Sequence, residues 1–379
     1  MSAPLRKPPS PRRPPSTARA KPSDGQGPRG RGASANPPGR FDRLHYAEPE
    51  EADAPPDAGP GPRTLFFSDP ARRLIATNDS PDVGFDASIN PYRGCEHGCI
   101  YCYARPTHEY LGFSAGLDFE TRILVKERAP ELLRAELSAR RWKPQVLGVS
   151  GVTDAYQPIE RRLRLTRRCL EVCAEFGNPV SIVTKNALVA RDADVLSPMA
   201  EAGTAAVHVS ITSLEGDLQR ALEPRASHPA QRLRAVETLA RAGVPTGVMV
   251  APIIPGLNDH EIPAILEASA RAGARFADYL IVRLPHGVLQ LFDGWLASRL
   301  PERRDKVLNR LRSLRGGRLN DPRFGHRHRG EGPFAEQVRA LFCTSARRHG
   351  LDADRPALST AGFRRPEPRE QGPQLPLFG

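Results

Sequence analysis

The sequence predicts an α/β protein built as a partial barrel of about six βα units. From Leu65 onward, short β-branched runs alternate with amphipathic segments of helical length. This alternation is typical of parallel strands joined by helices. At least five such units follow a cysteine-rich loop at residues 95–102, and one more strand is expected to end at that loop. Polar residues follow several of these strands, at the end where barrels carry their sites.

Each predicted element has its own sequence pattern. The strands are continuous apolar runs, as expected for a buried parallel sheet; they cover residues 146–150, 180–184, 205–212, 246–252 and 279–284. The intervening segments have helical periodicity; they cover residues 163–176, 190–202, 229–242 and about 259–272. Gly243 directly follows the third of these helices and is a natural C-cap.

Composition divides the chain into four parts. Residues 1–62 are rich in Pro, Gly and Arg, and are expected to be a disordered basic tail because they lack apolar periodicity. Within them, residues 29–44 are a candidate arm that docks on the core or on a ligand. Residues 63–290 are expected to form the barrel, 291–350 a basic helical extension, and 351–379 a flexible tail.

Positive charge is concentrated in two segments of a chain with net charge +12. Residues 1–40 hold nine Arg and Lys against one acid, a net +8, and residues 301–330 hold ten against three, a net +7. Such clusters suit a polyanion, although a solvated tail and a charged helix face are the alternative. The run 324–330, with His326 and His328, is expected to be part of this basic surface. No membrane span and no secretory leader are recognised, so a cytoplasmic location is expected.

Three of the six cysteines form a C-x3-C-x2-C pattern at Cys95, Cys99 and Cys102. In a reducing compartment this pattern indicates a metal or cluster site rather than disulfides. Structural zinc requires a fourth ligand, for which His97, Cys169 or Cys173 is available. Alternatively, three thiolates leave one iron of a [4Fe–4S] cluster open to a ligand.

The loop resembles that of the radical S-adenosylmethionine (SAM) enzymes, since the aromatic Tyr101 directly precedes the third cysteine. This resemblance implies a [4Fe–4S] cluster whose open iron binds SAM, and reductive cleavage of SAM to a 5′-deoxyadenosyl radical. It extends over about residues 70–351. The motifs at 90–95, 101–106, 154–160 and 184–185 are similar to the branch that includes spore photoproduct lyase and its non-sporulation, DNA repair photolyase-like relatives.

The resemblance also implies roles for single residues. Cys95, Cys99 and Cys102 are the expected metal ligands. The expected SAM-binding residues follow the strands or the loop; they are Tyr101, Ser150, Thr153, Asp154, Lys185, Ser210 and Pro252. Gly94 and Gly98 are expected to let the backbone wrap around the cluster. His108 and Glu109 are expected either to line the site or to be structural.

The chain departs from spore photoproduct lyase in one respect. That enzyme uses a further cysteine downstream of the loop as hydrogen-atom donor, and no cysteine lies between Cys102 and Cys169 here. The candidate donors are Tyr156, Cys169 and Cys343. Cys169 and Cys173, four residues apart on one predicted helix, and Cys343 are otherwise expected to be core residues.

The sequence 374–378, QLPLF, resembles the bacterial sliding-clamp-binding motif, with Pro376 in place of the usual Ser or Asp. The expected contacts with the clamp are made by Gln374, Leu375, Leu377 and Phe378; an apolar end packing on its own domain is the alternative.

The leading hypothesis is a radical SAM enzyme of lyase-like chemistry that acts on nucleic acid, with DNA favoured, and takes electrons from a reductant such as flavodoxin or ferredoxin. One alternative is radical SAM modification of RNA or a protein side chain. Another is a non-catalytic nucleic-acid-binding protein that holds a cluster or zinc.

Overall fold

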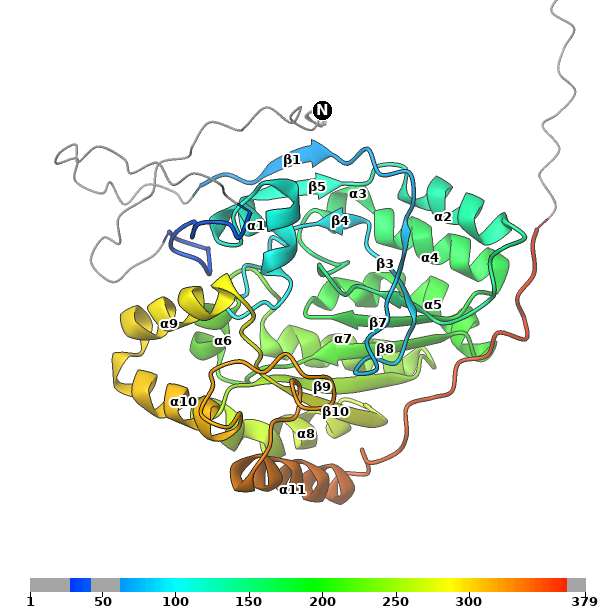
Figure 1. Cartoon of the computed structure of the whole chain (residues 1–379). Helices are drawn as coiled ribbons and strands as arrows, with labels where there is room; N and C mark the ends of the chain where they lie inside the picture. Colours follow the sequence, from blue (N-terminus) through cyan, green and yellow to red (C-terminus); the bar gives the residue numbers. More distant parts are fainter. Residues whose placement is uncertain (1–27, 42–61, 367–379) are drawn as a thin grey trace, which may run out of the picture.

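The computed structural model describes residues 28–41 and 62–366, and its centre is a seven-stranded sheet with strand order β10-β9-β8-β7-β6-β3-β2 (Figure 1). Six of these strands are parallel and β2 pairs antiparallel with β3. The strands are β2 (Ile75–Thr77), β3 (Ala87–Ile89), β6 (Leu147–Val149), β7 (Val180–Thr184), β8 (Ala205–Ser210), β9 (Thr246–Ile253) and β10 (Phe276–Ile281). The predicted α/β partial barrel with six parallel strands is therefore confirmed.

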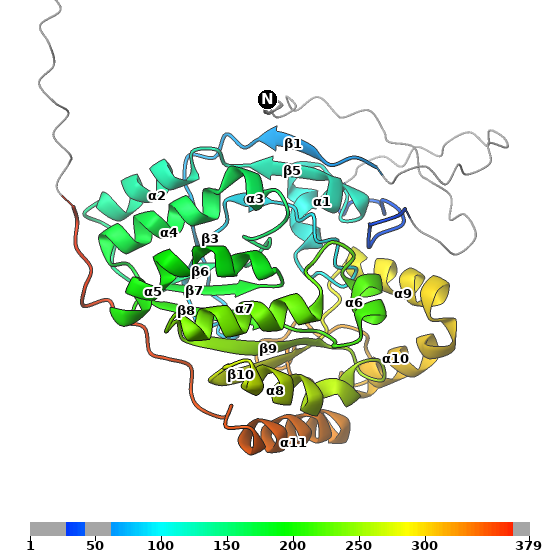
Figure 2. The same cartoon turned by 180° about the vertical axis from the view of Figure 1, so that it is seen from behind.

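Helices cover the outer face of this sheet, as the view from behind shows (Figure 2). They are α2 (Ala129–Ser138), α4 (Leu165–Phe176), α5 (Ala193–Glu201), α7 (Pro229–Arg241) and α8 (Ile262–Arg271). Helix α4 illustrates why: its buried residues include Leu165, Cys169, Cys173 and Phe176, which recur on one face of a helix. Cys169 and Cys173 are fully buried and belong to the main core, so the expectation that they are core residues is correct.

A second, three-stranded sheet lies beside the first and supports the cysteine loop (Figure 1). It contains β1 (Leu65–Ser68), β5 (Arg122–Val125) and β4 (Tyr92–Arg93). The short helical elements are η1 (Arg105–Leu111), α1 (Leu117–Thr121), α3 (Glu160–Leu163), η2 (Ala187–Asp192), α6 (Gly216–Leu222) and η3 (Asp259–Glu261). The loop between β4 and η1 carries the three clustered cysteines.

The C-terminal extension contains α9 (Gly287–Arg299), α10 (Pro301–Ser313) and α11 (Pro333–Arg348), of which α11 packs on α8. Many of its basic side chains have acidic partners within the domain. The ion pairs are Arg304–Asp293, Arg323–Asp321, Arg327–Asp82 and Arg329–Asp278. The expected polyanion-binding surface at 301–330 is thus partly neutralised, and its free charge is smaller than the sequence count.

The chain after α11 runs in extended form across the domain (Figure 2). The amide of Ala277 donates to Leu351 O at 3.0 Å, and the amide of Ser359 donates to Gly203 O at 2.9 Å. These backbone contacts hold the first part of the segment expected to be a flexible tail. The QLPLF motif lies outside the described residues.

No helix in ranges 28–41 and 62–366 has the length and apolar character needed to cross a membrane.

Candidate active site

The three clustered cysteines line one pocket at the carboxyl ends of the parallel strands. The pocket has a volume of about 180 Å³. All seven residues expected to bind SAM also line it; they are Tyr101, Ser150, Thr153, Asp154, Lys185, Ser210 and Pro252. Parallel strands bring these residues together because their carboxyl ends meet at one edge of the sheet.

Two glycines allow the cysteine loop to turn tightly. Gly94 and Gly98 have φ values of +79° and +68°, in the left-handed region that favours glycine. A Cβ at Gly98 would lie 2.8 Å from a carboxylate oxygen of Glu120, and a Cβ at Gly94 would lie 2.9 Å from Phe119 O. The backbone on both sides of Cys95 is therefore packed too closely for any other residue.

The three thiols fit a cluster better than a single zinc ion. Sulfur ligands of tetrahedral zinc lie roughly 3.8 Å apart, given Zn–S bonds of about 2.3 Å. In the described part of the chain, the residues whose ligand atoms all lie within 4.8 Å of one another are Glu215, His260 and Glu261, and not the three cysteines. Burial also raises the pKa of the Cys102 thiol to about 11 and that of Cys99 above its usual range, so these two thiols need a cationic partner to ionise.

Of the three alternative fourth ligands, His97 lines the pocket but contacts other side chains, and Cys169 and Cys173 lie outside it. His97 lies with its Nδ1 3.4 Å from Asp154 and its Nε2 3.0 Å from the Asn186 side-chain amide. Burial opposes the charged form of His97, but Asp154 and Cys95 raise its pKa to about 10. Cys169 and Cys173 are buried in α4 and do not line the pocket.

Asp154 ties the cysteine loop to the ends of β6 and β7. Besides its contact with His97, its carboxylate accepts hydrogen bonds from the Thr184 hydroxyl and the Lys185 amide, each at 2.8 Å. Burial opposes ionisation, yet His97 and these donors keep the pKa of Asp154 below its usual range. Asp154 is therefore an ionised anchor between three segments.

The loop after β6 approaches the cysteine loop directly. Thr153 donates its hydroxyl to Gly94 O at 2.6 Å, and Gln157 donates to the same oxygen at 3.2 Å. Ser150 has φ of +108°, a conformation that non-glycine residues rarely adopt. Such strain is concentrated at functional sites, and Ser150 lines the pocket.

Glu223 contacts two of the pocket residues, Tyr101 and Lys185, and the sequence offered no motif for it. This fully buried carboxylate accepts hydrogen bonds from Tyr101 and Arg232, and from the Thr212 hydroxyl at 2.5 Å. Lys185 Nζ lies 3.2 Å from it. Despite burial, the cations Arg232 and Lys185 hold the pKa of Glu223 well below its usual range.

Lys185 also donates to Ser210 Oγ at 2.9 Å and to Ala251 O at 2.7 Å, and its Nζ lies 5.6 Å from the Tyr101 ring centroid. Tyr101, Lys185 and Ser210 therefore form one connected network.

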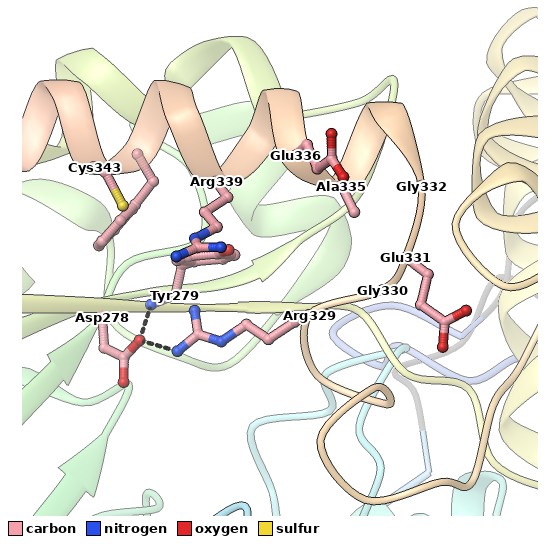
Figure 3. A pocket seen from close by; sticks show the side chains of 11 residues that line it. Asp278, Tyr279, Arg329, Gly330, Glu331, Gly332, Ala335, Glu336, Arg339 and Cys343 are labelled. Carbon is pink, nitrogen blue, oxygen red and sulfur yellow. Dashed lines mark hydrogen bonds and ion pairs between the residues drawn. The ribbon is translucent and has the colours of Figure 1, made fainter.

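The three candidate hydrogen-atom donors do not line this pocket. Tyr156 and Cys169 are fully buried in the main core. Cys343 lies on α11 above Asp278 and Tyr279, in a separate hollow of about 660 Å³ (Figure 3). The side chain is exposed, so the expectation that Cys343 is a core residue is wrong; the buried face of α11 instead uses Val338, Phe342 and Ala346.

Two other expectations are resolved by packing. His108 is buried against Phe119, its Nε2 lies 2.9 Å from Arg122 O, and burial lowers its pKa to about 4. Glu109 pairs with Arg40 at 2.5 Å. Both are structural and lie outside the pocket. His328, in contrast, lines the pocket and is not simply part of a basic surface.

The arm at residues 28–41 packs on the outer side of the cysteine loop. The amides of Gly32 and Ala33 donate to the buried Glu120 carboxylate at 3.0 and 2.8 Å. Arg31 donates to Glu120 O at 3.0 Å. Of the two roles open from the sequence, the structure shows docking on the core.

The chain belongs to the radical SAM superfamily, whose family model matches residues 89–268. The uncharacterized protein Rv2578c of Mycobacterium tuberculosis is 35% identical over 244 residues, which cover 63% of this chain and 71% of the relative. The uncharacterized protein MJ0683 of Methanocaldococcus jannaschii is 33% identical over 173 residues, which cover 46% and 62%. Members of the superfamily use a [4Fe–4S] cluster and S-adenosylmethionine as cofactors.

The fold is that of spore photoproduct lyase. A variant of that enzyme has a TM-score of 0.55 at 17% identity, covering 75% of this chain and 79% of the other. A second variant, solved with AdoMet and dinucleoside spore photoproduct bound, has a TM-score of 0.55 at 18% identity with the same coverage.

Proposed function

We propose that this radical SAM enzyme acts on nucleic acid, with DNA favoured, in a lesion-directed reaction of the photoproduct-lyase kind. The observation that carries the radical chemistry is the pocket itself, since three cysteines in the C-x3-C-x2-C spacing line it together with the strand ends. The nucleic-acid substrate is supported by the fold shared with spore photoproduct lyase and by the excess of basic residues.

In this proposal Cys95, Cys99 and Cys102 hold the cluster. When bound, the cluster supplies the electron that cleaves SAM to a 5′-deoxyadenosyl radical. The chain provides the positioning: Gly94 and Gly98 let the loop wrap closely, and the pair His97–Asp154 connects the loop to β7.

The SAM-binding roles rest on position. Tyr101, Lys185 and Ser210 present one polar wall, where the charge of Lys185 is balanced by Glu223. Ser150, Thr153 and Asp154 line the adjoining wall of the pocket. Pro252 lines the pocket at the end of its strand. Tyr103 directly follows the cluster loop and lines the pocket. The expected hydrogen-atom donors Tyr156, Cys169 and Cys343 do not line it.

Two measurements test this function separately. Anaerobically reconstituted protein with SAM and a reductant is expected to form 5′-deoxyadenosine, and the Cys99→Ala variant is expected not to. Incubation with UV-irradiated DNA is then expected to decrease the lesion content. SAM cleavage without lesion loss would contradict the DNA substrate, and protein that holds one zinc ion and cleaves no SAM would contradict the enzyme. Flavodoxin or ferredoxin is the proposed class of electron donor.

We further propose that the end of the chain tethers the enzyme to a sliding clamp. Gln374, Leu375, Leu377 and Phe378 resemble a clamp-binding motif, and burying two apolar side chains contributes roughly 3–6 kcal/mol before ordering costs. Such a weak contact raises the local concentration on DNA. Fluorescence anisotropy of a peptide covering residues 368–379 tests it; no saturable binding at high micromolar clamp would contradict it.

A further inference from the structure

Arg283 has a guanidinium group that the described residues leave without a hydrogen-bond partner. It follows β10 and lines the same pocket as the three cysteines. Its Nε is buried, and in ranges 28–41 and 62–366 no acceptor lies within hydrogen-bond distance of it. Its nearest aromatic contact is Tyr103, whose ring centroid is 5.7 Å from the guanidinium carbon.

Buried arginines are normally paired, because an uncompensated charge in the protein interior is costly. The acid that faces this wall, Asp82, is already engaged: its carboxylate accepts from Arg327 and from the Gly325 amide at 2.6 Å. Burial and the charge of Arg327 both lower the pKa of Arg283. An arginine remains charged even then, so the wall carries a positive charge that forms no ion pair within residues 28–41 and 62–366.

The surroundings of Arg283 place it towards the entrance of the pocket. The Tyr103 side chain beside it is 47% exposed, and its hydroxyl donates to Gly151 O at 2.8 Å in the loop after β6. His328 comes from the C-terminal extension and lines the same wall. Burial and the nearby arginines lower the pKa of His328 to about 4, so a neutral imidazole with hydrogen-bonding nitrogens adjoins the guanidinium.

We propose that Arg283 binds a phosphodiester group of the nucleic-acid strand at the entrance of the pocket, with His328 adjoining the same group. A guanidinium presents paired N–H donors that match two oxygens of a phosphate. The inference rests on the proposed nucleic-acid substrate, and it names the residue that orients that substrate towards the pocket. The carboxylate of SAM offers similar chemistry, but Lys185 and Ser210 already supply polar groups at the strand ends, whereas Arg283 lies beside the exposed Tyr103.

The test compares Arg283→Met with a matched control, Arg303→Met, in the cluster-loaded protein saturated with SAM. Arg303 is exposed on α10, so the control removes the same charge away from the pocket. The probes are a fluorescein-labelled 12-nucleotide oligothymidylate and the same oligomer with neutral methylphosphonate linkages. Anisotropy is measured over a salt series, and SAM affinity and iron content are measured on the same preparations.

Arg283→Met is expected to bind the phosphodiester oligomer about tenfold more weakly, the effect of one lost charge-assisted hydrogen-bonded contact. The slope of log affinity against log salt should fall by about one. Arg303→Met should change affinity much less, and the neutral oligomer should bind wild type and Arg283→Met equally. Arg283→Lys should recover part of the affinity, since a point charge remains without the paired geometry.

Three results overturn the inference. If wild type binds the oligomer and Arg283→Met binds it equally well, Arg283 does not contact phosphate. If SAM affinity falls while oligomer binding is kept, the arginine is a cofactor ligand instead. If wild type does not bind the phosphodiester oligomer, the proposed DNA substrate fails, and the assignment of Arg283 fails with it.

Discussion

Arg105 and Arg283 are two arginines near the cysteine loop, the first fully buried and the second half-buried, and they differ in how their donors are used. Arg105 is fully buried and donates from Nε and Nη2 to Cys99 O, from Nη1 to Ala115 O and Gly116 O, and from Nη2 to Glu120 at 2.5 Å. Arg283 has no such partner among the described residues. The comparison shows that the arginine donors on the outer side of the loop are paired within the protein. On the pocket side, the guanidinium of Arg283 is available to a ligand.

The saturated side extends into the N-terminal arm. Glu120 accepts from Arg105 and from the amides of Gly32 and Ala33, so hydrogen bonds run from the arm through Glu120 and Arg105 to the carbonyl of Cys99. All of these groups therefore have their hydrogen-bond partners within the protein.

The largest effect is expected for Arg105→Met. The substitution leaves the Glu120 charge and the Cys99 carbonyl buried with fewer donors, and breaking a buried ion pair costs about 3–5 kcal/mol. Urea unfolding under anaerobic conditions measures the free energy of unfolding. The iron content reports whether the cysteine loop still holds the cluster. Arg303→Met is the exposed control and should change stability little. A loss below about 1 kcal/mol for Arg105→Met would contradict the structural role.

His208 is a buried histidine that resists protonation in the folded chain. It lies on β8 against Phe276, and burial and Arg355 lower its pKa to about 4 from 6.5. As the pH falls, the His208 side chain takes up a proton near pH 6.5 in the unfolded chain but only near pH 4 in the folded chain. Stability should therefore fall as the pH drops through this window, by about 3 kcal/mol from this group.

Unfolding free energies measured between pH 7 and pH 4 check this. His208→Leu should lose correspondingly less stability over the window, while His260→Gln, at an exposed position, should follow the wild type. His108 and His328 also have a pKa of about 4 and contribute in the same direction. Parallel curves for wild type and His208→Leu would refute the assignment.

A smaller effect is expected where the arm meets the loop. A Cβ at Gly32 would lie 1.7 Å from Gly98 O, so Gly32→Val must displace the arm or the loop. Overpacking of this kind costs about 1–3 kcal/mol. Limited proteolysis should cleave the arm faster, and the unfolding midpoint should fall. Gly294→Ala, where a Cβ meets open space, is the control; an undisturbed arm in Gly32→Val would show that this contact is unimportant.

The smallest effect is expected for the stability of Arg283→Met. Because no acid partner is lost and a desolvated charge is removed, the free energy of unfolding should stay within about 0.5 kcal/mol of wild type or rise. Thermal unfolding of the two proteins side by side measures it. A loss comparable to that of Arg105→Met would mean that Arg283 is a structural residue.

The fold and the composition of the pocket were accessible from the sequence because both depend on local patterns. Apolar runs alternating with helical periodicity specify parallel strands and covering helices. Polar residues directly after those strands must gather at one edge, which explains why Lys185 and Ser210 line the same pocket as Cys95.

Cys343 shows where local patterns fail. The neighbouring Leu341 and Phe342 suggested a buried position, but a helix face can bury Phe342 while the next residue points outward.

The sequence by itself determined the spacing of the three cysteines, the order of the βα units and the strand ends that surround the loop. Only the tertiary structure decided which charged side chains are paired within the protein. Glu223 lies 122 positions from Tyr101 in the sequence, and the pairing of Asp82 with Arg327 joins residues 245 positions apart. Whether a buried charge is satisfied depends on what the whole fold places within about 3 Å of it, and that distance leaves Arg105 occupied and Arg283 free for a ligand.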